Sequence, residues 1–392
     1  MSNRINLKAL PNFLKNGSAG GIILLFCVII SLIVANSPLG EGFDDFLGTQ
    51  IGFNTENIHL RYPILLWIND GLMAIFFLLV GLEIKRELVE GELASPKKAA
   101  LPILCAIGGA LVPAFIYLLF NKGTLTEHGW GIPMATDIAF ALAAVTALGK
   151  RVPASLKIFL AALAIVDDLL AILVIAIFYS SELNYANLGY AGAIFLLLIL
   201  FNRFGVKNII FYLIPGVFIW YFIHHSGIHA TIAGVLTALT LPTTPDEKES
   251  PLEKLEHMLT KPVNFLIIPI FALANTNITF EDGMVEGLFS NLGLGIVLGL
   301  VLGKPIGILF VSWLSVKSKV GLLPRDANWL HMVGVGLLAG IGFTMSIFIA
   351  LLSFAEPHFV AEAKFSILTG SVLSAILGSI LLAFSGKKSY DS

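Results

Sequence analysis

The sequence predicts an all-α membrane protein with about twelve transmembrane helices. Of its 392 residues, 57% are hydrophobic and only 13% are charged, and the mean hydropathy is +0.88. A soluble domain carries about 25% charged residues, so this composition excludes an ordinary soluble protein. The apolar residues form repeated runs close to the length of about 20 residues that crosses a bilayer as a helix. The net charge of −2, without a basic block, gives no indication of nucleic-acid binding.

Twelve apolar runs are the predicted membrane spans. They lie near residues 18–36, 63–82, 99–120, 131–149, 156–179, 187–202, 208–222, 227–241, 262–275, 293–314, 331–353 and 362–385. The first run follows three basic residues and could be a cleaved signal peptide. It is slightly long for a signal core, and "VANS" is a poor cleavage site, so we interpret it as a retained first helix.

The distribution of Lys and Arg predicts the orientation of these spans. If the N-terminus is cytoplasmic and successive connecting segments alternate between the two sides of the membrane, the cytoplasmic segments hold 20 of the 24 Lys and Arg residues. The outer segments hold Arg61, Lys122 and Lys364, and Lys304 lies within a span. Cytoplasmic loops of membrane proteins carry an excess of positive residues. The asymmetry therefore predicts twelve spans, with both termini in the cytoplasm.

The first outer loop, residues 40–62, contains the stretch "TQIGFNTENIHL". Two short segments around residues 54–56 are compatible with a β-hairpin. Exposed strands can pair with a second copy of the chain, so a homodimer through this loop is one interpretation. An irregular loop is the alternative that the residues leave open.

The fourth and eleventh spans both contain helix-breaking residues. The fourth opens "GWGIPMATDIAF", where Pro133 donates no backbone hydrogen bond and restricts Ile132. We therefore expect a break just ahead of Asp137. The eleventh reads "GVGLLAGIGFTMSIF", and its repeated glycines favour either a break or close helix packing.

The two broken spans occupy corresponding positions in two triplets, residues 99–179 and 293–385, within one transmembrane domain, 1–392. The triplets start on opposite sides of the membrane, as inverted repeats require. If the broken helices cross, their like ends meet, and these ends carry partial charges. Asp137 is suited to balance the positive ends and Lys304 the negative ends. Snorkelling of Lys304 toward an interface is the alternative.

Asp167 and Asp168 are adjacent inside the fifth span, in "LAIVDDLLAI". A carboxylate at this depth is costly, and two adjacent ones repel each other when both are ionised. A chain keeps such a pair where it binds a cation, carries protons, or does both. A pair that is merely neutralised by burial or by a salt bridge is the alternative.

Further acidic groups lie in or near the spans. Asp70, in "WINDGLM", lies either in an outer access path or in a hydrogen bond within the bundle. His229 is interpreted as a hydrogen-bonded packing residue, because no second His or Cys has ligand spacing. Four more titratable residues are predicted to lie near the cytoplasmic side: Glu83, Glu87, Glu256 and His257. They either respond to pH or form an ordinary solvated face.

The chain resembles the bacterial NhaA sodium/proton antiporter family over essentially its whole length. The resemblance is carried by "NDGLMAIFFLLVGLEIKRE", "GIPMATDIAFALA", "LAIVDDLLAI", "SGIHATIAGVL", "NFLIIPIFALANT", "LGKPIG" and "LLAGIGFTMSIFI". It implies a twelve-helix fold in which the interrupted fourth and eleventh helices cross.

The resemblance also implies roles for individual residues. Asp167 and Asp168 would bind the ion and carry protons. Thr136 and Asp137 would lie at the crossing, and Lys304 near the aspartate pair. It further suggests a hairpin-mediated homodimer and a pH response that involves Glu83, Glu87, Glu256 and His257.

The predicted function is secondary active antiport of cytoplasmic Na⁺ or Li⁺ for external H⁺ in a bacterial inner membrane. We expect exchange by alternating access, electrogenic and activated at alkaline pH, with no cofactor. Asp168 is the first choice of direct ligand and Asp167 assists it, because adjacent helix positions do not share a face. Na⁺, Li⁺, H⁺ and the lipid bilayer are the expected partners, and no nucleic acid is expected.

Three alternatives belong to other classes. A symporter of an organic anion would use the same architecture, but two aspartates disfavour an anion. A passive cation channel would not use a proton gradient. An intramembrane aspartyl protease would carry a glycine–any–glycine–aspartate signature, which the sequence lacks, so an enzyme is not expected.

Overall fold

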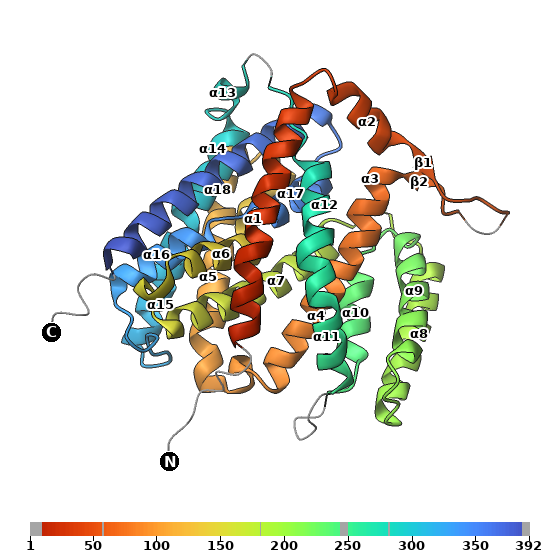
Figure 1. Ribbon diagram of the computed structural model, residues 1–392, viewed down its shortest axis with the longest axis horizontal. Coiled ribbons are helices and arrows are strands. Elements are labelled where there is room, and N and C mark those ends of the chain that lie inside the picture. Colours follow the sequence, from red (N-terminus) through yellow and green to blue (C-terminus); the bar gives the residue numbers. More distant parts are fainter. Residues whose placement is uncertain (1–9, 57–58, 181, 244–249, 281–282, 386–392) are drawn as a thin grey trace. The chain divides into compact units, whose positions relative to one another are not determined.

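The computed structural model describes the chain except residues 1–9, 57–58, 181, 244–249, 281–282 and 386–392 (Figure 1). The two chain ends, predicted to be cytoplasmic, lie outside the described residues. So do five of the basic residues on which the predicted orientation depends: Arg4, Lys8, Lys248, Lys387 and Lys388.

Eight helical segments of the described chain are long and apolar enough to cross a membrane. They are Ile64–Val89, Lys98–Asn121, Glu127–Ala147, Ala154–Phe178, Tyr185–Arg203, Pro251–Asn275, Asn291–Lys317 and Pro357–Ser385. Two helix pairs pass the same test but are bent, Ala19–Ala35 with Gly40–Gly48 by 110° and Trp329–Ala339 with Phe343–Ser353 by 44°. The protein is therefore an all-α polytopic membrane protein, with up to ten such spans in its described part.

Each of the twelve predicted spans overlaps a helix, but two of them overlap only a short helix that belongs to no longer helical segment. Helix α9 (Ile210–His224) has 15 residues and α10 (Ile232–Thr240) has nine. At about 1.5 Å per residue, nine residues extend roughly 14 Å, less than half of a hydrocarbon core of about 30 Å. Twelve complete crossings therefore stay a prediction.

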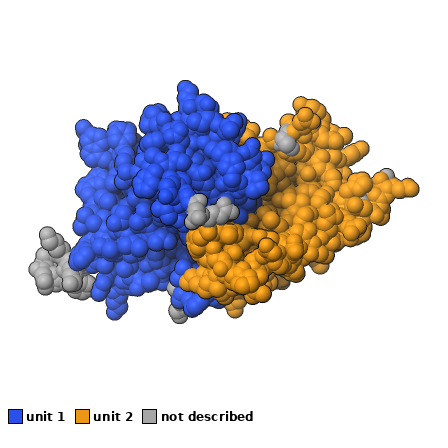
Figure 2. All heavy atoms as spheres, turned by 90° about the horizontal axis from the view of Figure 1, so that it is seen from above, with its two compact units in different colours: residues 1–26, 96–168, 282–392 blue, residues 27–95, 169–281 orange. Residues whose placement is uncertain are grey.

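The chain forms two compact units, which Figure 2 shows in different colours. Unit 1 comprises residues 1–26, 96–168 and 282–392. It contains residues 99–168 of the first predicted repeat and all of the second. Its helices are the start of α1 (Leu10–Ala35), α5 (Pro96–Asn121), α6 (Ile138–Ala147), the first part of α7 (Ala154–Phe178), α13 (Met284–Gly287), α14 (Asn291–Leu298), α15 (Lys304–Lys317), α16 (Trp329–Ala339), α17 (Phe343–Ser353) and α18 (Pro357–Ser385).

Glycines allow α5 and α15 to touch through their backbones in unit 1. A Cβ atom on Gly108 would lie 2.6 Å from the Gly307 carbonyl oxygen, and one on Gly307 would lie 2.1 Å from the Gly108 carbonyl oxygen. Any side chain at either position would force the helices apart. The neighbouring Gly109 leaves room for the Lys304 side chain, whose Cδ lies 3.7 Å from the Cβ position.

Three of the described span candidates in unit 1 contain an interruption of regular α-helix. A 3-10 helix, Glu127–Met134, ends before the extended residues that lead into α6. Helix α16 ends at Ala339 and α17 begins at Phe343. A π-helical stretch, Gly299–Gly303, precedes α15. The first two interruptions coincide with the proline and the glycines that predicted breaks in the fourth and eleventh spans.

Unit 2 comprises residues 27–95 and 169–281. It contains the rest of α1 and of α7, α2 (Gly40–Gly48), β1 (Gln50–Ile51), β2 (Tyr62–Pro63), α3 (Ile64–Leu66), α4 (Met73–Val89), α8 (Tyr185–Arg203), α9, α10, α11 (Pro251–Pro262) and α12 (Ile268–Asn275). Helices α8 and α9 lie side by side (Figure 1). Helix α10 packs closely on α4, because a Cβ atom on Gly234 would lie 2.2 Å from the Ala74 carbonyl oxygen.

The outer loop of unit 2 contains a short antiparallel sheet. Strand β1 pairs with β2, with Gln50 opposite Pro63 and Ile51 opposite Tyr62. Gly52 has φ +114° and its Cβ position lies 1.9 Å from the Leu60 carbonyl oxygen, so the bend after β1 requires glycine. Residues 57–58, near the predicted turn, lie outside the described part.

Candidate ion-binding site

The aspartate pair lies near the middle of α7, the most deeply buried of the span candidates. In its most apolar window 67% of the residues are buried, against 11% for α8. Asp167 is 1% exposed and Asp168 is 2% exposed. Two adjacent carboxyl groups are therefore held away from both lipid and water, in unit 1.

Lys304 is the cationic partner of Asp167. Its Nζ donates a hydrogen bond of 2.5 Å to Oδ2 of Asp167, and both side chains are fully buried. Lys304 is the first residue of α15, directly after the π-helical stretch. The other oxygen of Asp167, Oδ1, is buried and makes no hydrogen bond within the described chain. A buried carboxylate oxygen of this kind can accept a proton or bind a hard cation.

Asp137 lies at the N-termini of two helices. Its Oδ1 accepts from the Phe140 N–H at 3.1 Å, which caps α6. Its Oδ2 accepts from the N–H of Thr344 at 3.0 Å and from the Thr344 hydroxyl at 2.5 Å, near the start of α17. One carboxylate therefore faces the partial positive charges of both helix ends.

Hydroxyl groups bind the carbonyl oxygens at the same two breaks. Thr136 donates to the Ala339 carbonyl at 2.8 Å, where α16 ends, and Ser346 donates to the Ile132 carbonyl at 2.7 Å, in the 3-10 helix. The Asp137 N–H donates to the Ile341 carbonyl at 2.6 Å. Irregular backbone at membrane depth needs internal partners of this kind.

The structure therefore brings together three of the predicted site residues with Lys304. Asp167 bonds to Lys304, Thr136 neighbours Asp167, and Asp137 follows Thr136 in the same extended segment. Lys304 is bonded to a carboxylate, whereas the carbonyl ends of the broken helices accept hydrogen bonds from hydroxyls. Sequence reasoning did not single out Thr344 or Ser346. The available signal was two hydroxyl residues, two positions apart, directly after the glycines of the eleventh span.

Asp70 lies in a separate cluster in unit 2. It is part of a π-helical stretch, Trp67–Leu72, and is 9% exposed. Its Oδ2 lies 3.0 Å from Nδ1 of His224, and its Oδ1 lies 3.5 Å from Nε2 of His229. A cavity of about 190 Å³ is lined by Asp70, Tyr179, His224, Gly227, Ile228, His229 and Ala230. The histidine partners of Asp70 were not expected from the sequence.

His229 has a polar neighbour at each ring nitrogen. Its Nδ1 lies 2.8 Å from the Thr231 hydroxyl, and its Nε2 faces Asp70. Within the described residues, no group of three or more His, Cys, Asp or Glu is arranged to hold a metal ion.

The predicted pH-responsive residues gather around Arg86 in unit 2. The Arg86 Nε lies 3.1 Å from Oε2 of Glu256, and its Nη2 lies 3.5 Å from Oε1 of Glu87. Glu83 is buried, with Arg86, Glu87 and Glu256 as its charged neighbours. His257 is on the exposed side of α11 and interacts electrostatically with Glu256.

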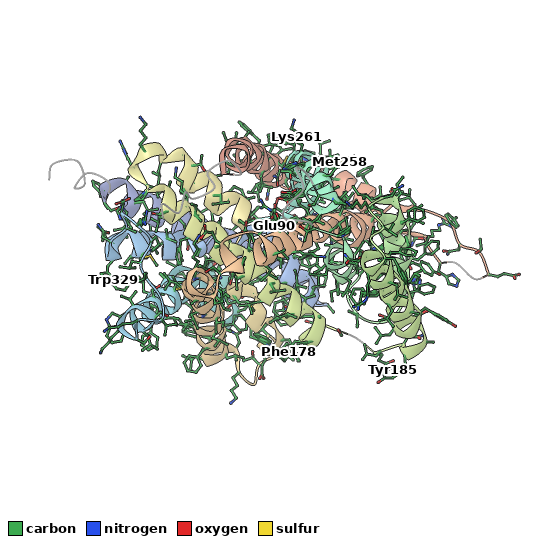
Figure 3. The ribbon with its side chains drawn as sticks, turned by 90° about the horizontal axis from the view of Figure 1, so that it is seen from below. Glu90, Phe178, Tyr185, Met258, Lys261 and Trp329 are labelled. Carbon is green, nitrogen blue, oxygen red and sulfur yellow. The ribbon has the colours of Figure 1, made fainter. Side chains whose placement is uncertain are left out.

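The outward face of α11 contrasts with this buried charge cluster. Met258 and Lys261 point outward from the helix (Figure 3), and Met258 is 61% exposed. Glu256 is only 7% exposed on the same helix. Glu83 and Glu256 are therefore buried, whereas His257 lies on the exposed side of α11.

The chain is similar to known proteins over nearly its full length. The family model described as Na⁺/H⁺ antiporter 1 matches residues 11–382. A relative from Flavobacterium johnsoniae, named Na(+)/H(+) antiporter NhaA 2, is 66% identical over 392 residues, which cover 100% of this chain and 96% of the relative. The Na(+)/H(+) antiporter NhaA of Bordetella parapertussis is 47% identical over 380 residues, with 95% and 96% covered.

A third relative, the Na(+)/H(+) antiporter NhaA of a Shewanella species, is 48% identical over 379 residues, covering 96% of this chain and 97% of the relative. Both the family match and the relatives extend over nearly the full length. From this coverage and identity we conclude that the chain belongs to the Na⁺/H⁺ antiporter 1 family.

Proposed function

We propose that this protein exchanges cytoplasmic Na⁺ or Li⁺ for external H⁺ as a secondary active antiporter. The observation that carries the proposal is the buried pair Asp167–Asp168 in mid-helix, with Asp167 bonded to Lys304 at 2.5 Å. Intramembrane ionisable residues mark ion pathways and proton relays. The family description and the names of the relatives, which read Na⁺/H⁺ antiporter, support antiport of Na⁺ and H⁺.

Asp168 is the proposed direct ligand and Asp167 assists it. Lys304 occupies Oδ2 of Asp167 and leaves Oδ1 of that carboxylate without a hydrogen bond in the described structure. Na⁺ and Li⁺ are hard cations that prefer carboxylate, hydroxyl and carbonyl oxygens, as Ca²⁺ and Mg²⁺ do. Thr136 and Asp137 support the site by holding the interrupted helices beside it.

The proposed cycle is competition between H⁺ and the cation for the same carboxylates. Proton release makes the site anionic and the cation binds. Reprotonation on the other side of the membrane expels the cation. Alternating access would arise from movement of the two predicted repeats, 99–179 and 293–385, within one transporter.

The exchange is proposed to be electrogenic and active at alkaline pH. If two protons move against one Na⁺, one net charge crosses the membrane per cycle. Such a charge contributes about 2.3 kcal/mol per 100 mV of membrane potential. At low pH the bound protons exclude the cation, so transport should rise with pH.

The remaining assignments complete this proposal. Asp70, with its cavity in unit 2, belongs to an outer access path. The cluster around Arg86 modulates the response to cytoplasmic pH through Glu83, Glu87, Glu256 and His257. Both chain ends face the cytoplasm of a bacterial inner membrane, and the loop 40–62 with its two-stranded sheet contributes to a homodimer.

Everted membrane vesicles test the function directly. A pH gradient is imposed by respiration, and addition of Na⁺ or Li⁺ should dissipate it in wild-type vesicles. Vesicles with Asp168→Asn should not respond, although the protein is inserted in normal amounts. A cation-independent gradient in wild-type vesicles would contradict the antiporter assignment.

Symport of an organic anion is not favoured by the site. An anion would need a cationic anchor, and the buried Lys304 is already bonded to Asp167. Because the everted-vesicle assay contains no organic substrate, a response to Na⁺ alone distinguishes antiport from such symport.

A further inference from the structure

Helix α18 contributes a hydroxyl to the start of α17 in unit 1. The Ser371 Oγ accepts from the N–H of Gly342 at 3.2 Å and from the N–H of Phe343 at 3.1 Å. Ser371 is 4% exposed. Since Phe343 is the first residue of α17, Ser371 caps this helix from a different element, 28 residues further along the chain.

Ser371 and Asp137 divide the N–H groups of this helix end between them. Ser371 accepts from residues 342 and 343, and Asp137 accepts from Thr344. Three consecutive N–H groups, which have no partner within the helix itself, are thus satisfied. At membrane depth no water replaces a lost partner, so each acceptor matters more than at an exposed helix end.

The start of α17 is also connected to the aspartate pair. Asp137 is bonded to Thr344 and, through its N–H, to the Ile341 carbonyl. Thr136, the preceding residue, is bonded to the Ala339 carbonyl and neighbours Asp167. Displacing the start of α17 would therefore displace the segment that lies beside Asp167.

We propose that Ser371 is a positioning residue for the cation site, which acts by holding the N-terminus of α17 against Asp137. The proposal rests on the antiport function proposed above. It differs from a purely structural role because it assigns to Ser371 an effect on cation affinity in the folded protein. A residue needed only for folding would change the amount of active protein and not the affinity of each molecule.

Ser374 supplies a matched control on the same helix. It lies one turn beyond Ser371 and is 0% exposed. Its hydroxyl makes no hydrogen bond within the described structure, although it lies 2.7 Å from the Cβ position of Gly340 at the same break. Ser374→Ala therefore removes the same atom from the same region without removing a hydrogen bond.

The experiment measures Na⁺-dependent exchange in proteoliposomes with purified protein. The apparent KM for Na⁺ and the maximal rate per folded protein are compared among wild type, Ser371→Ala, Ser374→Ala, and the pair Ser371→Thr and Ser371→Val. Thr and Val have nearly the same shape, but only Thr keeps the hydroxyl acceptor.

We expect Ser371→Ala and Ser371→Val to raise the apparent KM at least about fivefold. This change corresponds to the lower end of the free-energy cost of leaving a buried polar group without a hydrogen bond. Ser371→Thr and Ser374→Ala should stay within about twofold of wild type. An unchanged KM in folded Ser371→Ala, or an equal rise in Ser374→Ala, would overturn the positioning role. Equal KM values for the Thr and Val variants would overturn it as well.

Failure of the variants to fold and failure of the wild type to transport have different consequences. If neither hydroxyl-free variant folds, Ser371→Cys is measured, because its thiol is a weak acceptor. A KM clearly above that of wild type supports the proposal, and a wild-type KM refutes it. If wild-type protein itself shows no Na⁺-dependent exchange, the proposed antiport function fails, whereas an active wild type with an unaffected Ser371→Ala refutes only the role of Ser371.

Discussion

Asp167 and Asp168 are neighbours in sequence but have different surroundings. Asp167 is bonded to a buried lysine through Oδ2, and this bond neutralises one of the two negative charges. Burial of two uncompensated carboxylates would be much more costly than burial of one. The ion pair with Lys304 therefore lowers the cost of burying the two adjacent carboxyl groups.

The site assignment predicts that Asp168→Asn abolishes exchange while the protein still inserts and folds. Asn keeps the size of the side chain but cannot ionise, so neither H⁺ nor Na⁺ is bound as before. Asp167→Asn should be severely impaired. The measurement is Na⁺-dependent dissipation of a pH gradient in everted vesicles, and near-normal dissipation in Asp168→Asn would disprove the assignment.

Lys304→Ala should destabilise the protein as well as slow transport. Removing one partner of a buried ion pair leaves an uncompensated charge, at a cost of about 3–5 kcal/mol. Thermal unfolding in detergent measures this effect. Lys317→Ala is the control, because Lys317 lies at the other end of α15 over the Trp313 ring.

A double variant tests whether charge compensation is the cause. Lys304→Met combined with Asp167→Asn removes both charges, and should recover much of the stability lost in Lys304→Met alone, although transport stays low. If the double variant is less stable than either single variant, the structural effect of Lys304 does not arise from its charge.

At the scale of elements, the two breaks are tied by reciprocal hydrogen bonds. Hydroxyls of Thr136 and Ser346 bind carbonyls of the opposite broken helix, and Asp137 caps α6 and α17 together. Breaking a helix in a membrane exposes backbone groups that must find partners in the protein. The hydroxyl residues next to each break provide these partners.

Asp137 variants should show that one carboxylate serves two helices. Asp137→Ala removes both caps and should lower stability by roughly 1–3 kcal/mol. Asn has a single acceptor oxygen and can serve only one of the two helix ends, so Asp137→Asn should be intermediate. The check is thermal unfolding in detergent, and Asn equal to wild type would contradict the double cap.

At the scale of the whole molecule, competition predicts that apparent Na⁺ affinity rises with pH. If protons and Na⁺ bind the same carboxylates, as proposed, added Na⁺ should also move the transport profile to lower pH. The measurement is apparent KM for Na⁺ against pH in proteoliposomes. An affinity that does not depend on pH would refute competition at the aspartates.

The Arg86 cluster predicts a separate contribution to this profile. Glu256→Gln with His257→Ala removes two titratable groups around Arg86, which lies 3.1 Å from Glu256. The double variant should have a shallower or shifted pH profile with unchanged maximal rate. An unchanged profile would leave the competition intact and remove the cluster as a sensor.

The residues alone predict much of the fold because the relevant signals are local. Hydropathy and charge identify the membrane class, and every predicted span overlaps a helix. Pro133 predicts the break in the fourth span, because it acts on its own backbone. The glycines around Gly340 are compatible with a break or with close packing, and the structure shows a break between α16 and α17. The lengths of the helices are less well predicted. For example, α10 has only nine residues, although the apolar run that predicted it is longer.

The sequence by itself determined the membrane class, the intramembrane acids and the break in the fourth span, and it left a break in the eleventh span as one of two alternatives. Only the tertiary structure decided which groups are hydrogen-bonding partners. Lys304 and its partner Asp167 are 137 residues apart in the sequence, and Thr344 and its partner Asp137 are 207 residues apart. Asp70 likewise faces His224 and His229, and Ser371 caps α17. The physical reason is that a break or an apolar run follows from neighbouring residues, whereas a hydrogen-bonding partner depends on which helices pack together.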